Sequence, residues 1–167
     1  GDVDAVQSDG TDAPSRWRRV EAAAERETRR AGRRFQLERE VVGHARRRLV
    51  VLGQAGDRDD DALRALARST FRMRPDRVVL KEMEAYLRGR AVGEASGVME
   101  AEFRALGVPP DDIVHAPSEY EAVRTALAWA RDGDLLFLPT HAERERVLQL
   151  LDRLQGMGWR PGASLPD

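Results

Sequence analysis

One short stretch limits the fold of this chain more than any other: an apolar run, a glycine turn and a series of aspartates that follow one another directly. Residues 49–52 are Leu-Val-Val-Leu, and so short an apolar, partly β-branched run is typical of a buried strand. The glycines at either end of residues 53–56 allow a tight turn. Residues 57–61 carry four aspartates, which favours a helix start with Asp59 or Asp60 as N-cap. The stretch predicts a βα unit, and open α/β sheets bind ligands at the carboxyl ends of such strands.

The same alternation of strand and helix recurs three more times along the chain. Further strands are expected at residues 77–81, 113–115 and 135–138, and helices at 60–73, 94–106, 119–130 and 142–154. Ser118 is the expected N-cap of the third helix, with Glu121 as its capping-box partner. Four strand–helix units predict an α/β domain with a mainly parallel sheet of about four strands, right-handed crossovers and helices on both faces.

The composition removes several classes of protein. The chain has 167 residues, of which 41% are hydrophobic, enough for the core of one domain. It has no cysteine, which excludes disulfides, thiolate metal sites and a cysteine nucleophile. Its net charge of −1 does not favour nucleic acid as a partner, and no apolar run approaches the roughly 20 residues of a membrane helix. No signal peptide is visible, and a cytoplasmic protein is expected.

The region before the first strand differs in composition from the rest. Residues 1–15 are small, polar and acidic, and are expected to form a disordered arm. Residues 16–47 predict a basic amphipathic helix or two, with an apolar stripe that includes Trp17 and Phe35. We interpret it as a solvated helix packed on the domain or on a neighbour; an acidic partner or nucleic acid is the alternative, for which the aromatic residues are few. Residues 161–167 are expected to form a tail.

The carboxyl ends of parallel strands share one edge, so the loops that follow the four strands are expected to meet there. These loops are residues 53–59, 81–93, 115–118 and 139–143. The candidate binding residues at this edge are Arg58, Asp59, Lys81, Glu82, Arg88, Arg90 and His141, with Gly53, Gly56 and Asp57 shaping the first loop. Guanidinium groups at such positions can bind a carboxylate or phosphate through two hydrogen bonds.

Each candidate also has a purely structural interpretation. Arg58 can form a local ion pair with the aspartates beside it. Lys81, the only lysine in the chain, can be a solvated charge at a strand end or a charge for an anionic ligand. His141 can cap the last helix or contact a ligand. Arg88 and Arg90 lie in a connection too long for a minimal turn, and connections of this length are often binding loops.

Several kinds of chemistry find no support in the sequence. A phosphate-binding loop needs Gly-Lys-Ser/Thr, and Lys81 follows Leu80. Residues 53–56 do not match the dinucleotide-binding glycine fingerprint, and no serine stands in a nucleophile-elbow motif. The aspartates at 57–61 are better explained by a helix N-terminus than by a metal site. We therefore expect no catalytic residue and no metal ligand in this chain.

Three segments together resemble a known family. They are Gly-Gln-Ala-Gly-Asp-Arg-Asp at 53–59, Asp-Arg-Val-Val with Lys-Glu at 76–82, and Leu-Arg-Gly-Arg with Gly-Glu at 87–94. In this pattern the chain is similar to the C-terminal domain of Mur-type ligases, above all to the Mur-ligase portion of cyanophycin synthetase and its relatives. Ser118-Glu119 and the loop from Pro139 to His141 fit the same pattern, and the resemblance covers about residues 47–160.

The resemblance implies a Rossmann-like, lid-like domain that binds the incoming amino acid or peptide. In such ligases ATP and magnesium serve to activate a carboxylate as an acyl phosphate, and a central domain, in cis or in trans, holds the phosphate loop. Arg58 then matches a position that approaches the substrate, residues 81–90 the amino-acid-selecting segment, and His141 a loop with further contacts. The family's Asp-Tyr-Ala/Gly-His-Asn-Pro segment is not present before the first strand; residues 40–48 stand there, with His44 as its only counterpart. The chain alone is thus not expected to be catalytic, and a stand-alone binding or interaction module that has lost ligase activity is the alternative.

Overall fold

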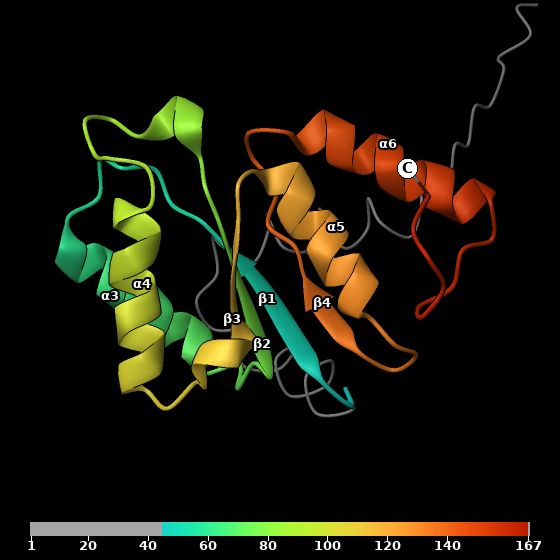
Figure 1. The fold of residues 1–167 in the computed structure, drawn as a ribbon, viewed down its shortest axis with the longest axis horizontal. Helices are drawn as coiled ribbons and strands as arrows, with labels where there is room; N and C mark the ends of the chain where they lie inside the picture. The colour runs from blue at the N-terminus through green and yellow to red at the C-terminus, as the bar shows by residue number, and fades with distance from the viewer. Residues whose placement is uncertain (1–44, 167) are drawn as a thin grey trace, which may run out of the picture. The chain divides into compact units, whose positions relative to one another are not determined.

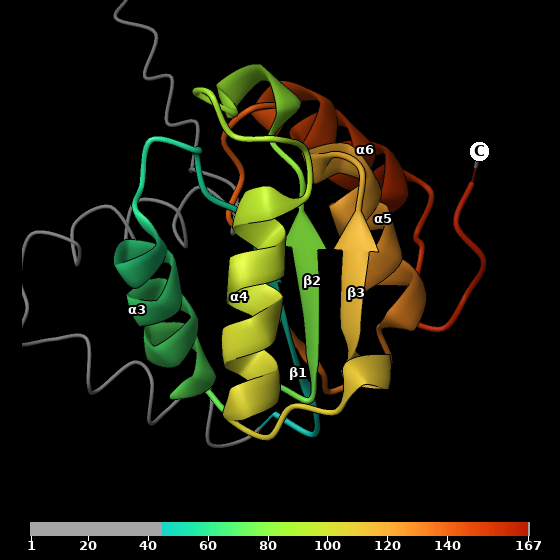
Figure 2. The same ribbon diagram turned by 60° about the vertical axis from the view of Figure 1, so that its left-hand side comes forward.

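A four-stranded parallel sheet forms the centre of the domain (Figures 1 and 2). In the computed structural model of the chain, residues 45–166 are described, so the expected arm at 1–15, His44 and most of the basic segment at 16–47 lie outside this part. The strands are β1 (Arg48–Leu52), β2 (Arg77–Lys81), β3 (Ile113–Ala116) and β4 (Leu135–Phe137). Their order in the sheet is β3-β2-β1-β4, and every pairing is parallel.

Two pairs of helices cover the two faces of the sheet and complete a three-layer, Rossmann-like α/β domain (Figure 1). On one face lie α3 (Asp60–Phe71) and α4 (Glu94–Ala105), and on the other α5 (Glu119–Trp129) and α6 (Arg144–Gly156). Two short 3-10 helices, η1 (Glu84–Tyr86) and η2 (Pro110–Asp112), lie in the connections. The fold class predicted from the sequence is therefore confirmed for residues 45–166. Within these residues, no helix is both long enough and apolar enough to cross a membrane.

The strand order creates a topological switch point at the carboxyl edge. From β1 the chain steps through α3 to β2 and through α4 to β3, always away from β1 in the same direction. It then crosses through α5 on the opposite face and enters the sheet on the other side of β1 as β4. The connections that leave β1 and β4 thus diverge to opposite faces, which is the arrangement that places ligand sites in open α/β sheets.

Burial explains why the central strands carry so few polar residues. Leu49, Val50 and Val51 in β1, and residues 78–80 in β2, have no exposed surface, since helices cover both faces. One side of the core is centred on Phe103 of α4, and the other joins α5 to the apolar face of α6.

The ends of the elements follow local chemistry. The Asp59 carboxylate accepts a hydrogen bond of 2.7 Å from the Ala62 N–H, and Ser118 caps α5 in the same way, so both expected N-caps are confirmed. Residues 45–47 are not helical, although the basic helix was expected to reach residue 47; the Arg46 N–H donates to the Gly133 carbonyl and leads the chain into β1. Helix α6 begins at Arg144 rather than at residue 142, because the Glu119 carboxylate takes the N–H groups of the loop that precedes it.

Candidate functional site

Two of the loops at the carboxyl edge are tied firmly together. The Gly56 N–H donates to the Tyr86 carbonyl over 2.8 Å, which joins the loop after β1 to the connection after β2. A Cβ atom added at Gly56 would lie 1.8 Å from the carbonyl oxygen of Leu87, so only glycine fits this approach. Residues 53–59 and 84–90 are therefore joined at the edge of the sheet.

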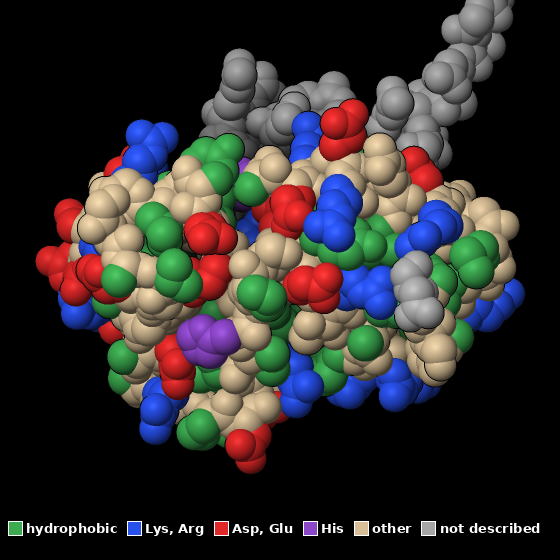
Figure 3. All heavy atoms as spheres, turned by 45° about the horizontal axis from the view of Figure 1, so that its top comes forward, with side chains coloured by type: hydrophobic (Ala, Val, Ile, Leu, Met, Phe, Trp, Pro, Cys, Tyr) green, Lys and Arg blue, Asp and Glu red, His purple; other side chains and the backbone are tan. Residues whose placement is uncertain are grey.

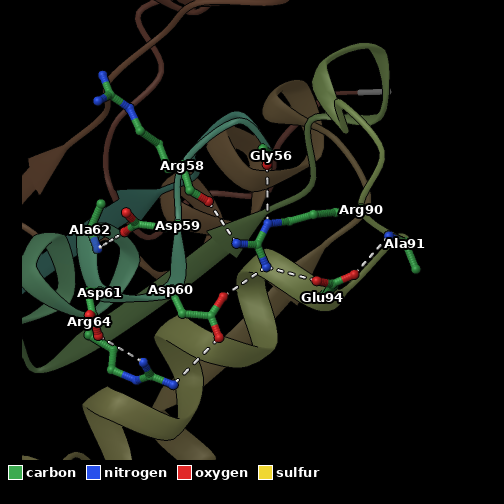
Figure 4. A network of polar contacts seen from close by, with 10 residues as sticks. All are labelled: Gly56, Arg58, Asp59, Asp60, Asp61, Ala62, Arg64, Arg90, Ala91 and Glu94. Atoms are coloured by element: carbon green, nitrogen blue, oxygen red, sulfur yellow. Dashed lines mark hydrogen bonds and ion pairs between the residues drawn. The ribbon is translucent and has the colours of Figure 1, made fainter.

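Arg90 is the centre of this junction (Figure 4). Its guanidinium donates to the carbonyl oxygens of Gly56 at 3.2 Å and Arg58 at 2.7 Å. It also forms ion pairs with Asp60 at 2.9 Å and Glu94 at 2.8 Å, and these two carboxylates raise its pKa further. With its side chain only 16% exposed and four acceptors engaged, Arg90 holds the two loops in place rather than offering its charge to a ligand.

Arg58 and Arg88 differ from Arg90 in this respect. Both are exposed, and neither guanidinium makes a hydrogen bond or ion pair within residues 45–166. Figure 4 shows the Arg58 side chain directed away from the network around Arg90, although its backbone carbonyl is part of that network. Arg88 occupies the left-handed region with φ of 50°, next to Gly89 at 95°, at the tip of the second loop. The structure thus gives two cations on the joined loops, without partners among residues 45–166.

Lys81 has an environment that neither sequence interpretation anticipated. Its side chain has no exposed surface, and its ammonium group pairs with the Glu119 carboxylate and donates to the Pro139 carbonyl at 2.6 Å. It is therefore neither solvated nor open to a ligand at this edge. Glu119 is the residue that sequence reasoning missed. The signal was a single lysine at the end of a buried strand in a chain whose other basic residues are all arginine.

The Glu119 carboxylate connects its own helix, α5, with the end of β2 and with the loop before α6. It lies at the first position of α5 and accepts the N–H of His141 at 2.8 Å and of Glu143 at 3.0 Å, in the loop before α6. Burial alone would raise its pKa, but the hydrogen bonds from Lys81 and from these two backbone groups outweigh burial and hold the pKa below its usual value. The carboxylate is therefore ionised in the folded domain.

This lowered pKa predicts a dependence of stability on acidity. A carboxyl group with a depressed folded-state pKa stabilises the fold above its unfolded pKa, about 4.3 for glutamate, and loses that contribution as the pH falls through the folded value. We expect urea-unfolding free energies measured from pH 6 down to pH 3 to fall less steeply in Lys81→Met/Glu119→Gln than in the wild type. As a control, Asp57→Asn changes an exposed carboxylate at the same edge and should keep the wild-type slope. Equal slopes in all three proteins would contradict the assignment.

The remaining candidates have mixed environments. Glu82 accepts a hydrogen bond from the Ser96 hydroxyl, which ties it to α4. Asp59 serves as the cap of α3, whereas Asp57 is exposed. The His141 ring is exposed although its backbone is fixed by Glu119. Of the predicted set, only the side chains of Arg58, Arg88, Asp57 and His141 are thus exposed at the edge without a partner within residues 45–166.

The charges around this region are mixed in sign. Figure 3 shows acidic and basic side chains interspersed with apolar ones over the face that it presents, with no broad patch of one sign. Among the described residues, no group of three or more His, Asp or Glu side chains is arranged to hold a metal ion. Individual arginines at this edge could bind a small anionic group through paired hydrogen bonds.

Sequence comparison with protein families and with curated proteins adds no relative. No protein-family model matches the chain, and no curated protein matches it by sequence. The resemblance of the sequence to Mur-type ligases therefore rests on its motif segments alone.

Proposed function

We propose that residues 45–166 form the substrate-binding, lid-like C-terminal domain of an ATP-dependent amide-bond-forming ligase of the Mur and cyanophycin synthetase type. In this proposal Arg58 and Arg88 bind a carboxylate or phosphate of the substrate at the carboxyl edge of the sheet. The domain is not catalytic alone, because ATP and magnesium are bound by a central ligase domain that carries the phosphate loop, in cis or in trans.

The observation that carries the proposal is the contrast between the basic residues at this edge. Lys81 and Arg90 have their charges satisfied inside the domain, whereas Arg58 and Arg88 do not. Arg58 is anchored through its own carbonyl to Arg90, so its backbone is held while its guanidinium has no partner within residues 45–166. Binding by a guanidinium on a fixed backbone loses less conformational entropy than binding by one on a flexible loop.

The motif segments of the family resemblance support the same site. The Gly-Asp-Arg segment supplies Arg58, and the Arg-Gly-Arg segment supplies Arg88 together with the residue that holds the two loops. The first segment thus contributes the Arg58 guanidinium. The second contributes the Arg88 guanidinium and Arg90, whose hydrogen bonds join the two loops. A lid that closes over a reaction site needs such a preorganised surface, because loose contacts would lose affinity to ordering costs.

Removal of both free arginines tests the site directly. We expect Arg58→Ala/Arg88→Ala to weaken binding of an anionic ligand by about 100-fold or more, since each charged hydrogen-bonding group contributes roughly 1.5–3 kcal/mol. Isothermal titration calorimetry of the full chain measures this effect. The ligands to be tested are free amino acids, short acidic peptides and Mg·ATP. Each variant should keep the wild-type thermal unfolding transition, because neither side chain has a partner among residues 45–166.

A matched control distinguishes the loss of a specific site from the effect of a lower net positive charge. Arg153→Ala/Arg160→Ala removes two exposed arginines from α6 and the segment after it, and should leave binding unchanged. Equal affinity of the Arg58/Arg88 variant and the wild type would overturn the proposed site. Ligand binding without amide formation, even when a phosphate-loop domain encoded beside this chain is supplied, would favour the stand-alone binding module over the ligase.

A further inference from the structure

The buried Lys81–Glu119 pair is not part of the proposed anion site, yet it binds the backbone of a loop at the carboxyl edge. The two side chains are 0% and 1% exposed. Lys81 ends β2 and Glu119 begins α5, so the pair joins a strand to a helix on one face of the sheet. Its remaining hydrogen bonds all go to the backbone of a different segment, the loop between β4 and α6.

These two side chains bind three backbone groups of that loop. The Lys81 ammonium group binds the Pro139 carbonyl, and the Glu119 carboxylate binds the N–H groups of His141 and Glu143. These backbone groups lie outside the strands and helices, because β4 ends at residue 137 and α6 begins at residue 144. The pair therefore supplies the partners of three backbone groups in the loop. A separate link to α5 is made by the Glu143 carboxylate, which accepts the Tyr120 N–H at 2.8 Å.

The loop after β1 is in contact with the same lysine. A Cβ atom added at Gly53 would lie 2.5 Å from Cγ of Lys81 and 2.8 Å from its carbonyl oxygen. Gly53 thus packs directly on the lysine stem. Because β1 and β4 flank the topological switch point, the two loops that leave it both lie against Lys81 or its partner.

An apolar pair of similar size could fill this space equally well. Replacement of a buried ion pair by apolar residues is often neutral or stabilising, so burial alone does not require charges here. What an apolar pair cannot do is accept two N–H groups and donate to a carbonyl in the loop after β4. The specific contribution of Lys81 and Glu119 is therefore to the position of that loop.

We infer that Lys81 and Glu119 are positioning residues, which fix the loop at residues 138–143 against the start of the loop after β1 at the switch point. The pair thereby sets where His141 lies relative to Gly53 and the segment that carries Arg58. That this geometry serves ligand binding rests on the proposed function. The positioning itself does not, and it is tested without a ligand.

Amide hydrogen exchange tests the positioning in the full chain. In the wild type, the amides of His141 and Glu143 should be protected although they lie in irregular structure. In Lys81→Met/Glu119→Leu, we expect their protection to fall about 10-fold or more relative to amides of β1 and β2, because each loses a charge-assisted hydrogen bond. Lys81→Met/Glu119→Gln removes the same charges but keeps an acceptor oxygen, and should restore part of the protection.

The exchange results distinguish a role of the pair in positioning the loop from a role in overall stability alone. Loss of protection that is uniform across core and loop would show that the pair only stabilises the fold, and would overturn the inference. So would rapid exchange of the His141 and Glu143 amides in the wild type, a result that does not depend on how any variant folds. Failure of Arg58 and Arg88 to bind an anion would leave these exchange rates unaffected, so the two proposals fail separately.

Discussion

Lys81→Met is expected to destabilise the domain by about 3–5 kcal/mol, the cost of leaving one member of a buried ion pair without its partner. Met matches the lysine stem in size, so packing beneath Gly53 is largely kept. The substitution removes the cation that pairs with the Glu119 carboxylate, which is 1% exposed and then keeps its hydrogen bonds from backbone N–H groups. Urea denaturation at pH 7 measures the difference in unfolding free energy.

Two further variants serve as comparisons for the unfolding free energy of Lys81→Met. Arg64→Met removes a cation whose contacts with Asp60 and Asp61 are solvent-exposed, and should cost no more than about 1 kcal/mol. The double variant Lys81→Met/Glu119→Leu should recover much of the loss, because it leaves no buried charge unpaired. A Lys81→Met loss as small as that of Arg64→Met would contradict the buried pairing.

The order and type of the elements were predictable because they depend on local pattern. Apolar runs of four or five residues predicted β1 and β2, since strands covered on both faces carry apolar side chains at every position. Asp59 and Ser118 marked helix starts because capping uses groups within three residues of each other. Convergence of the loops at one edge followed from the parallel arrangement alone.

The roles of individual charges were not predictable in the same way, because they depend on contacts between distant segments. Arg88 and Arg90 are two residues apart and look alike in the sequence, yet one is exposed and the other binds the backbone of residues 56 and 58. Lys81 and Glu119 are 38 residues apart, and nothing in the spacing of either indicates the other. A sequence pattern thus locates the edge, whereas tertiary structure decides which of its charges are available to a ligand.

Gly56→Ala is expected to disrupt the site without touching any residue that binds a ligand. The added Cβ would lie 1.8 Å from the Leu87 carbonyl oxygen and 2.7 Å from its carbon, and these are backbone atoms that cannot rotate away. The loops at 53–59 and 84–90 must then separate, which breaks the bond from the Gly56 N–H to Tyr86 and lengthens those from Arg90. We expect a loss of about 3 kcal/mol in unfolding free energy, the upper range for steric overpacking.

The separation also predicts a loss of binding by the folded domain, in addition to the loss of stability. Arg58 and Arg88 sit on the two loops that Gly56 brings together, so Gly56→Ala should weaken the anion site about as much as removal of one arginine, roughly 10-fold or more. Gly97→Ala is the matched control: it lies within α4, its Cβ would meet nothing within 4 Å, and alanine there should leave the stability unchanged or raise it by up to about 1 kcal/mol. Calorimetric titration and urea denaturation of both variants separate the two effects. Normal binding by a folded Gly56→Ala domain would mean that the ligand does not bridge the two loops, and that Arg58 and Arg88 do not act on the same molecule.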